Sequence, residues 1–103
     1  MIKTVVYIPE VDNDGDAFTH ADWAWLHAEL LARFGGYSLV GVVNGAWLEE
    51  GTTYHDQNRE YVVSLQSWAQ TPEWLACVNA IRERFRQIAL YVEVAGIPEI
   101  LSG

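Results

Sequence analysis

The segment 71–95 constrains the fold most, because the spacing of its apolar residues changes from helical to strand-like within a few positions. Residues 71–73 (Thr-Pro-Glu) are typical of a helix start, with a capping hydroxyl, a proline at the first helical position and an acid in the first turn. The apolar residues that follow at helical spacing are Trp74, Cys77, Val78, Ile81, Phe85 and Ile88. From Leu90 to Val94 they alternate with Tyr91 and Glu93, as in a strand. A helix that leads directly into a strand needs a sheet to pack on.

The rest of the chain supplies strands for that sheet. Segments 3–11, 37–50 and 53–65 are rich in β-branched and aromatic residues, and the last two form a long hairpin around a turn at Gly51. Two glycines interrupt the second strand, which indicates a bulge or the close approach of another backbone: Gly41 and Gly45. The residues after Gly96 are apolar enough to pack as a short extra strand.

The first helix is predicted between Thr19 and Phe34. Thr19 and Asp22 form a capping box with Asp in place of Glu, and two glycines follow Phe34. The face away from the core carries Trp25 among alanines, which is unusual for a solvated face. Trp25 therefore either packs against a neighbouring loop or makes a helix–helix or partner contact.

The predicted order is β-α-β-β-α-β, the ferredoxin-like pattern of an α+β two-layer sandwich. It places two helices on one face of a four-stranded antiparallel sheet, within one domain that spans residues 1–103. The other face of the sheet is then free of helices. Four strand aromatics could line that free face: Tyr7, Trp47, Tyr61 and Tyr91.

The net charge of −8 excludes several partners. Nucleic acids and anionic membranes select basic surfaces, so neither is expected to bind. No segment has the pattern of a signal peptide or of a membrane span, and we expect a soluble, cytoplasmic protein. An acidic protein that mimics nucleic acid and occupies a basic partner is a further hypothesis.

Candidate chemistry centres on His55 and Asp56 in the polar middle of the hairpin. Both residue types serve as general acids or bases, and each could act with a tyrosine or Glu93 across the sheet. Neighbouring residues of a strand point to opposite faces, so the two cannot simply form a dyad. No HExxH, CxxC, GxSxG, Walker or GxGxxG motif is present, and we expect neither a metal site nor a cofactor.

Three short motifs resemble small bacterial proteins of the ferredoxin-like α+β type. They are Arg33-Phe34-Gly35-Gly36-Tyr37, Gly45-Ala46-Trp47 and Arg84-Phe85-Arg86-Gln87. The resemblance implies the fold and no catalytic residues. The architecture is also similar to that of dimeric α+β barrel proteins, which include cofactor-free monooxygenases; this is an analogy of fold.

These observations favour an oligomeric binding or interaction module, most simply a homodimer that pairs through the free sheet face or through Trp25. The alternative is a small-molecule enzyme of the dimeric barrel type, with His55, Asp56 and a sheet tyrosine lining a pocket. A small apolar ligand or a protein partner fits either hypothesis.

Overall fold

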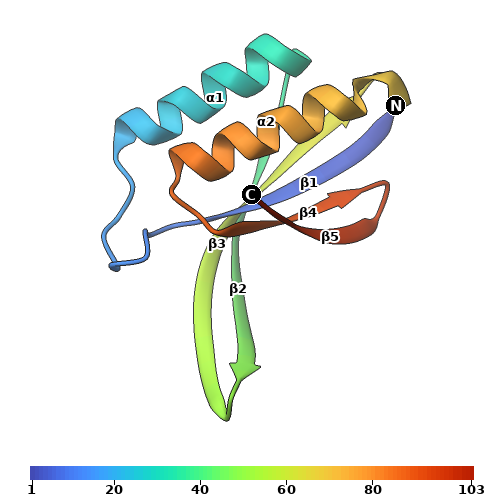
Figure 1. Cartoon of the computed structure of the whole chain (residues 1–103). Helices are drawn as coiled ribbons and strands as arrows, with labels where there is room; N and C mark the ends of the chain where they lie inside the picture. The colour runs from blue at the N-terminus through green and yellow to red at the C-terminus, as the bar shows by residue number, and fades with distance from the viewer.

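The computed structural model describes the whole chain, residues 1–103. Its elements are β1 (Ile2–Pro9), α1 (His20–Phe34), β2 (Ser38–Glu49), β3 (Thr52–Leu65), the short 3-10 helix η1 (Trp68–Gln70), α2 (Thr71–Arg84), β4 (Ala89–Val94) and β5 (Ile97–Ser102). The sheet has the order β2-β3-β1-β4-β5, and every neighbouring pair is antiparallel. Both helices lie on one side of it (Figure 1).

This α+β arrangement agrees with the prediction of two helices on an antiparallel sheet, but the prediction of four strands is wrong. The fifth strand forms because Ala95 and Gly96 both adopt positive φ, at 53° and 81°. Two such residues make a tight turn whose twist suits a hairpin, and β5 therefore returns along β4. The apolar tail after Gly96 is thus an edge strand of the sheet.

The helix ends follow local signals. At the start of α1, Thr19 and Asp22 form the predicted capping box, and Gly35 ends the helix at φ 78°. The sequence predicted that the apolar face of α2 extends to Ile88, which is wrong. The helix ends at Arg84, and Ile88 is 81% exposed. Arg86 adopts a φ of 53°, which turns the chain toward β4.

The core lies between the helices and the sheet. Sixteen buried residues form one hydrophobic cluster: Val6, Ile8, Phe18, Trp23, Leu26, Leu30, Tyr61, Val63, Leu65, Trp74, Cys77, Val78, Ile81, Phe85, Leu90 and Val92. Side chains alternate along a strand, so the intervening residues of β1, β3 and β4 point to the face that the helices leave uncovered. We call this surface the open face.

The β2–β3 hairpin extends well beyond the body of the molecule (Figure 1). Strand β1 pairs with β3 only as far as Pro9 opposite Asn58. Past that point one hydrogen bond of 3.0 Å, from the Glu10 N–H to the Gln57 carbonyl, still joins the chain after β1 to β3. Beyond it β2 and β3 pair only with each other, and we call residues 44–57 the arm. A bulge between Leu39 and Gly41 precedes it on β2. No helix in the structure is long and apolar enough to cross a membrane.

Candidate functional site

A groove of about 1310 Å³ lies where the open face of the sheet meets the arm and the loop after β1. Its lining residues come from β1, β3, β4 and β5 in the body and from both strands of the arm. The groove is open to solvent, since Ile100 and Trp47 on its walls are 65% and 48% exposed. It combines aromatic side chains with carboxylates.

A pair of tyrosines forms the body end of the groove. The rings of Tyr7 and Tyr91 lie 4.7 Å apart at 34°, and the Tyr91 hydroxyl donates a hydrogen bond of 2.9 Å to Glu93. Partial burial, and then the charges of Glu60 and Glu93, raise the pKa of the Tyr7 hydroxyl. The hydrogen bond to Glu93 raises the pKa of Tyr91. Both phenols therefore remain neutral, and they lie beside the Glu60 and Glu93 carboxylates.

A second aromatic pair lies on the arm. Trp47 and Tyr54 are directly opposite on β2 and β3, with their rings stacked 5.4 Å apart at 20°. Alternation from Tyr7 opposite Glu60 places this pair on the open-face side of the arm. Their half-exposed rings offer a flat apolar surface to a ligand.

Asp56 lies between the two aromatic pairs. It is opposite Gly45, and a Cβ atom on Gly45 would lie 2.5 Å from the Asp56 Oδ1 atom. The sequence predicted a bulge or the close approach of another backbone at Gly45, but the structure places the Asp56 side chain over the glycine instead. His55 also borders the groove, but alternation directs its side chain to the opposite face of the arm from Asp56. The two predicted catalytic candidates are therefore not brought together.

Tyr61 is an expected open-face aromatic, and the structure places it on the helix side instead. It is fully buried, and its hydroxyl shares a hydrogen bond of 2.8 Å with Nε2 of His27. The His27 ring stacks on Tyr37 at 4.8 Å. Nearby, the Arg59 guanidinium lies 3.7 Å above the Trp23 ring. This cluster belongs to the packing of α1 on the sheet.

Trp25 is half-buried rather than free. It packs against the edge of the core, and the Arg84 guanidinium of α2 lies 5.3 Å from its ring. Of the two interpretations of Trp25, the structure therefore favours a helix–helix contact. Trp47, Tyr7 and Tyr91 share one surface, and Trp25 lies on the other side of the sheet from them.

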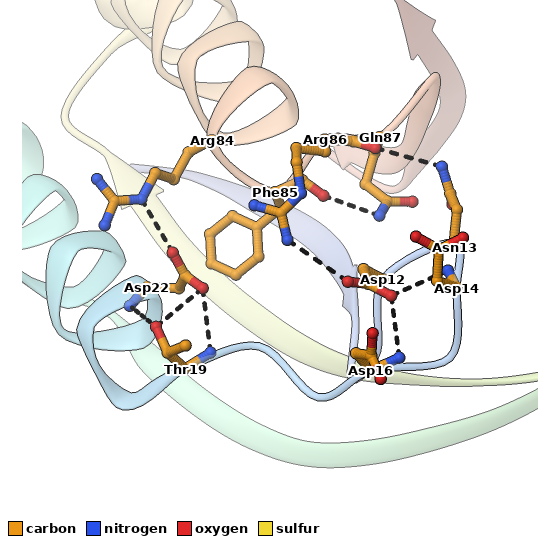
Figure 2. Close-up of polar contacts among 10 residues, drawn as sticks. All are labelled: Asp12, Asn13, Asp14, Asp16, Thr19, Asp22, Arg84, Phe85, Arg86 and Gln87. Carbon is orange, nitrogen blue, oxygen red and sulfur yellow. Dashed lines mark hydrogen bonds and ion pairs between the residues drawn. The ribbon is translucent and has the colours of Figure 1, made fainter.

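The loop after β1 contributes Asp12 and Asn13 to one end of the groove, and Figure 2 shows the polar contacts that hold this loop. The Asp12 carboxylate accepts hydrogen bonds of 2.9 Å from the backbone N–H groups of Asp14 and Asp16 and lies 3.7 Å from Arg86. Asn13 reaches the Arg86 carbonyl at 3.4 Å. These contacts fasten the loop to the turn between α2 and β4.

Sequence patterns did not identify Asn58, which lines the floor of the groove. Asn58 and its neighbour Glu60 are open-face residues of β3, and their side follows only from the register of β3 with β1. The useful signal is alternation: Glu60 pairs with Tyr7 and so shares its face.

The structure holds no cluster of three or more His, Cys, Asp or Glu residues that could bind a metal ion. Cys77 is buried in the core, and burial raises the pKa of its thiol to about 11. A protonated, buried thiol is a poor nucleophile, so Cys77 is structural. The reactive groups available to a ligand are the open-face carboxylates and phenols.

No protein-family model matches the sequence, and no curated protein matches it significantly. Solved structures do share its fold. A phage SAM lyase in complex with S-methyl-5'-thioadenosine has a TM-score of 0.74 at 19% identity, covering 99% of this chain and 89% of that one. The apo state of a phage SAM lyase gives 0.64 at 15% identity, with the same coverage. A divalent cation tolerance protein (Cut A1) from Thermus thermophilus gives 0.56 at 11% identity, covering 100% and 82%.

Proposed function

We propose that this chain binds S-adenosylmethionine in the open-face groove and cleaves it as a lyase. The observation that carries the proposal is the chemistry of the groove, in which two aromatic pairs flank carboxylates with no lysine or arginine among the lining residues. The similarity of the whole chain to a phage SAM lyase supports it.

The groove suits a nucleoside that carries a sulfonium ion. A positive charge is attracted by aromatic faces and by carboxylates, and the groove presents both. Asp56 is the best placed carboxylate, because its side chain crosses Gly45 and makes no hydrogen bond within the chain. The nucleoside itself requires flat apolar surfaces, which Trp47 with Tyr54 and Tyr7 with Tyr91 provide.

The chemistry balances without water or a cofactor. Release of S-methyl-5'-thioadenosine breaks the bond from sulfur to the four-carbon amino acid chain, and the bonding electron pair moves to sulfur and cancels its charge. The carbon left behind can be attacked by the carboxylate oxygen of the same chain, which gives a lactone. Alternatively, the chain loses a proton from the neighbouring carbon, which gives an alkene and requires a base. The carboxylates that the groove offers as bases are those among its lining residues, Glu10, Asp12 and Asp56.

A carboxylate beside the sulfonium promotes binding more than the bond-breaking step. The positive charge on sulfur disappears as the bond breaks, so an attraction to that charge is weaker in the transition state than in the bound substrate. We therefore assign Asp56 to substrate capture. The groove accelerates the reaction by holding the amino acid chain folded against its own reactive carbon.

The test is to incubate the purified chain with S-adenosylmethionine and to identify both fragments by chromatography and mass spectrometry. We expect S-methyl-5'-thioadenosine, and the mass of the four-carbon fragment together with its retention time separates the lactone from the alkene. Asp56→Asn should raise KM about tenfold with little loss of kcat, since one charge-assisted contact contributes about 1.5 kcal/mol.

Glu83→Gln is the matched control, because Glu83 is an exposed carboxylate on α2, on the helix side of the sheet. It should leave both constants unchanged. A chain that neither binds S-adenosylmethionine by calorimetry nor releases the thioether would refute the proposal.

We also propose that the chain self-associates through the arm and the β2 edge, most simply as a homodimer. Strand β2 is an edge strand, and Val40, Val42 and Leu48 expose 60%, 55% and 71% of their surface. An isolated two-stranded ribbon is marginally stable in water, and exposed apolar edge strands favour pairing with another chain. A second copy of this chain offers the same edge, and light scattering at several concentrations measures the association.

A further inference from the structure

We infer that Asn58 reads the edge of an adenine base at the floor of the groove. The inference rests on the proposed function and adds to it the residue that selects the base. Asn58 lines the groove from the centre of the sheet, with Pro9 of β1 opposite it on one side and Val43 of β2 on the other. It is not among the residues that the sequence singled out for binding.

The side chain of Asn58 has no hydrogen-bond partner within the chain and faces the groove. The residue is only 9% exposed, and its amide makes no hydrogen bond to any other group of the chain. Its amide atoms nevertheless remain accessible to solvent in the groove, so water satisfies them when no ligand is bound. Since this amide faces the groove, a ligand that fills the groove can take the place of that water and pair with the amide.

The chemistry of the amide matches adenine. An asparagine side chain presents one carbonyl acceptor beside two N–H donors. Adenine presents the complementary pair on one edge, the N6 amino group as donor and N7 as acceptor. Hypoxanthine, with a carbonyl oxygen in place of the amino group, presents two acceptors there and leaves the amide carbonyl unpaired.

The surroundings of Asn58 fit a base with a charged substituent. Asp56 and Glu60 are two residues away on the same face, each about 7 Å along the strand. When a neutral base lies over Asn58, a charged substituent on the far side of its sugar therefore lies next to a carboxylate. Tyr7, which is opposite Glu60, lies close enough in the sheet to cover one face of the base.

The test compares binding of S-methyl-5'-thioadenosine and S-methyl-5'-thioinosine to the whole chain by calorimetry. Both probes are neutral; they differ in the group at position 6, which Asn58 would contact, and in the proton that hypoxanthine carries on N1. We expect the native chain to prefer the adenosine by about 10-fold to 100-fold, the range of a good bidentate amide contact. The 7-deaza analogue of the adenosine, which lacks the N7 acceptor, should bind about as weakly as the inosine.

Asn58→Leu, which keeps the branched shape of the side chain without its polar atoms, should bind all three nucleosides within about threefold of one another. Asn79→Leu on the exposed face of α2 is the control and should keep the native preference. Thermal unfolding verifies that each variant is folded. If Asn58→Leu is unfolded, the comparison of the three ligands on the native chain tests the role of Asn58.

Equal binding of the three nucleosides to the native chain would overturn the role of Asn58 and leave the proposed function standing. A preference that persists in folded Asn58→Leu would also overturn it. Binding of none of them would refute both proposals.

Discussion

His27 is a partly buried residue whose surroundings oppose its charged form. Burial, the nearby Arg59 and then His20 lower the pKa of His27. The neutral ring shares a hydrogen bond with Tyr61, whose own pKa is raised by burial. A neutral pair of this kind fits beneath α1, where a charged imidazole would have no carboxylate partner.

We expect the protein to lose stability as the pH falls from about 7 to 5. The folded pKa of His27 lies below that of the unfolded chain, about 6.5, so in this range the unfolded state binds more protons. His27→Gln keeps a polar partner for Tyr61 and removes the titration. Urea unfolding at several pH values should show a smaller loss for His27→Gln than for the native chain, and parallel losses would contradict the assignment.

Helix α1 depends on one carboxylate at its start. Asp22 accepts hydrogen bonds of 3.0 Å from the backbone N–H of Thr19 and 3.1 Å from Nε of Arg84 (Figure 2). The hydrogen bond from the Thr19 backbone is the main reason why the pKa of Asp22 is lowered. Asp22 therefore joins the start of α1 to the end of α2.

Asp22→Ala should lower the free energy of unfolding at pH 7 by about 1–2 kcal/mol, since it removes a cap and leaves Arg84 unpaired. Because the folded pKa is depressed, the contribution of Asp22 is present above the unfolded pKa and is lost as the pH falls through the folded value. Asp14→Ala, in the exposed loop, is the control and should change stability by less than about 0.5 kcal/mol. Equal effects of the two substitutions would contradict the role of Asp22.

Elements with local signals were predicted well, and those set by distant pairing were not. The start of α1 at Thr19 and its end at Gly35 follow from neighbouring residues alone. The side to which Tyr61 points depends instead on the register of β3 with β1, two strands that are far apart in the sequence. For the same reason Asp56 was identified by residue type, while its neighbours in the groove, Tyr54 and Asn58, were not.

The whole molecule is an asymmetric body with a long projection, 42 × 30 × 25 Å in extent. Its arm carries exposed apolar side chains on a ribbon that has no third strand beside it (Figure 1). We therefore expect the arm and the neighbouring β2 edge to determine the oligomeric state of the protein in solution.

Val42→Lys should shift the protein toward the monomer, because a lysine on an edge strand opposes pairing with another chain. We expect an association weaker by about tenfold or more by light scattering or sedimentation, with the monomer mass of 11.6 kDa approached on dilution. Ile88→Lys, at an 81% exposed position after α2, is the control and should leave the mass unchanged. A native chain that is monomeric at all concentrations would contradict self-association.

The bulge in β2 gives this strand two different phases. Before it, Leu39 is opposite Tyr61 and shares the helix side of the sheet; after it, Gly41 is opposite Glu60 and shares the open face. The single extra residue, Val40, thereby turns Trp47 toward the groove, whereas an uninterrupted strand would turn it away. The bulge thus determines which residues of β2 face the groove. Any insertion or deletion that cancelled it without restoring the register would exchange the ligand-facing and outward-facing residues of the arm.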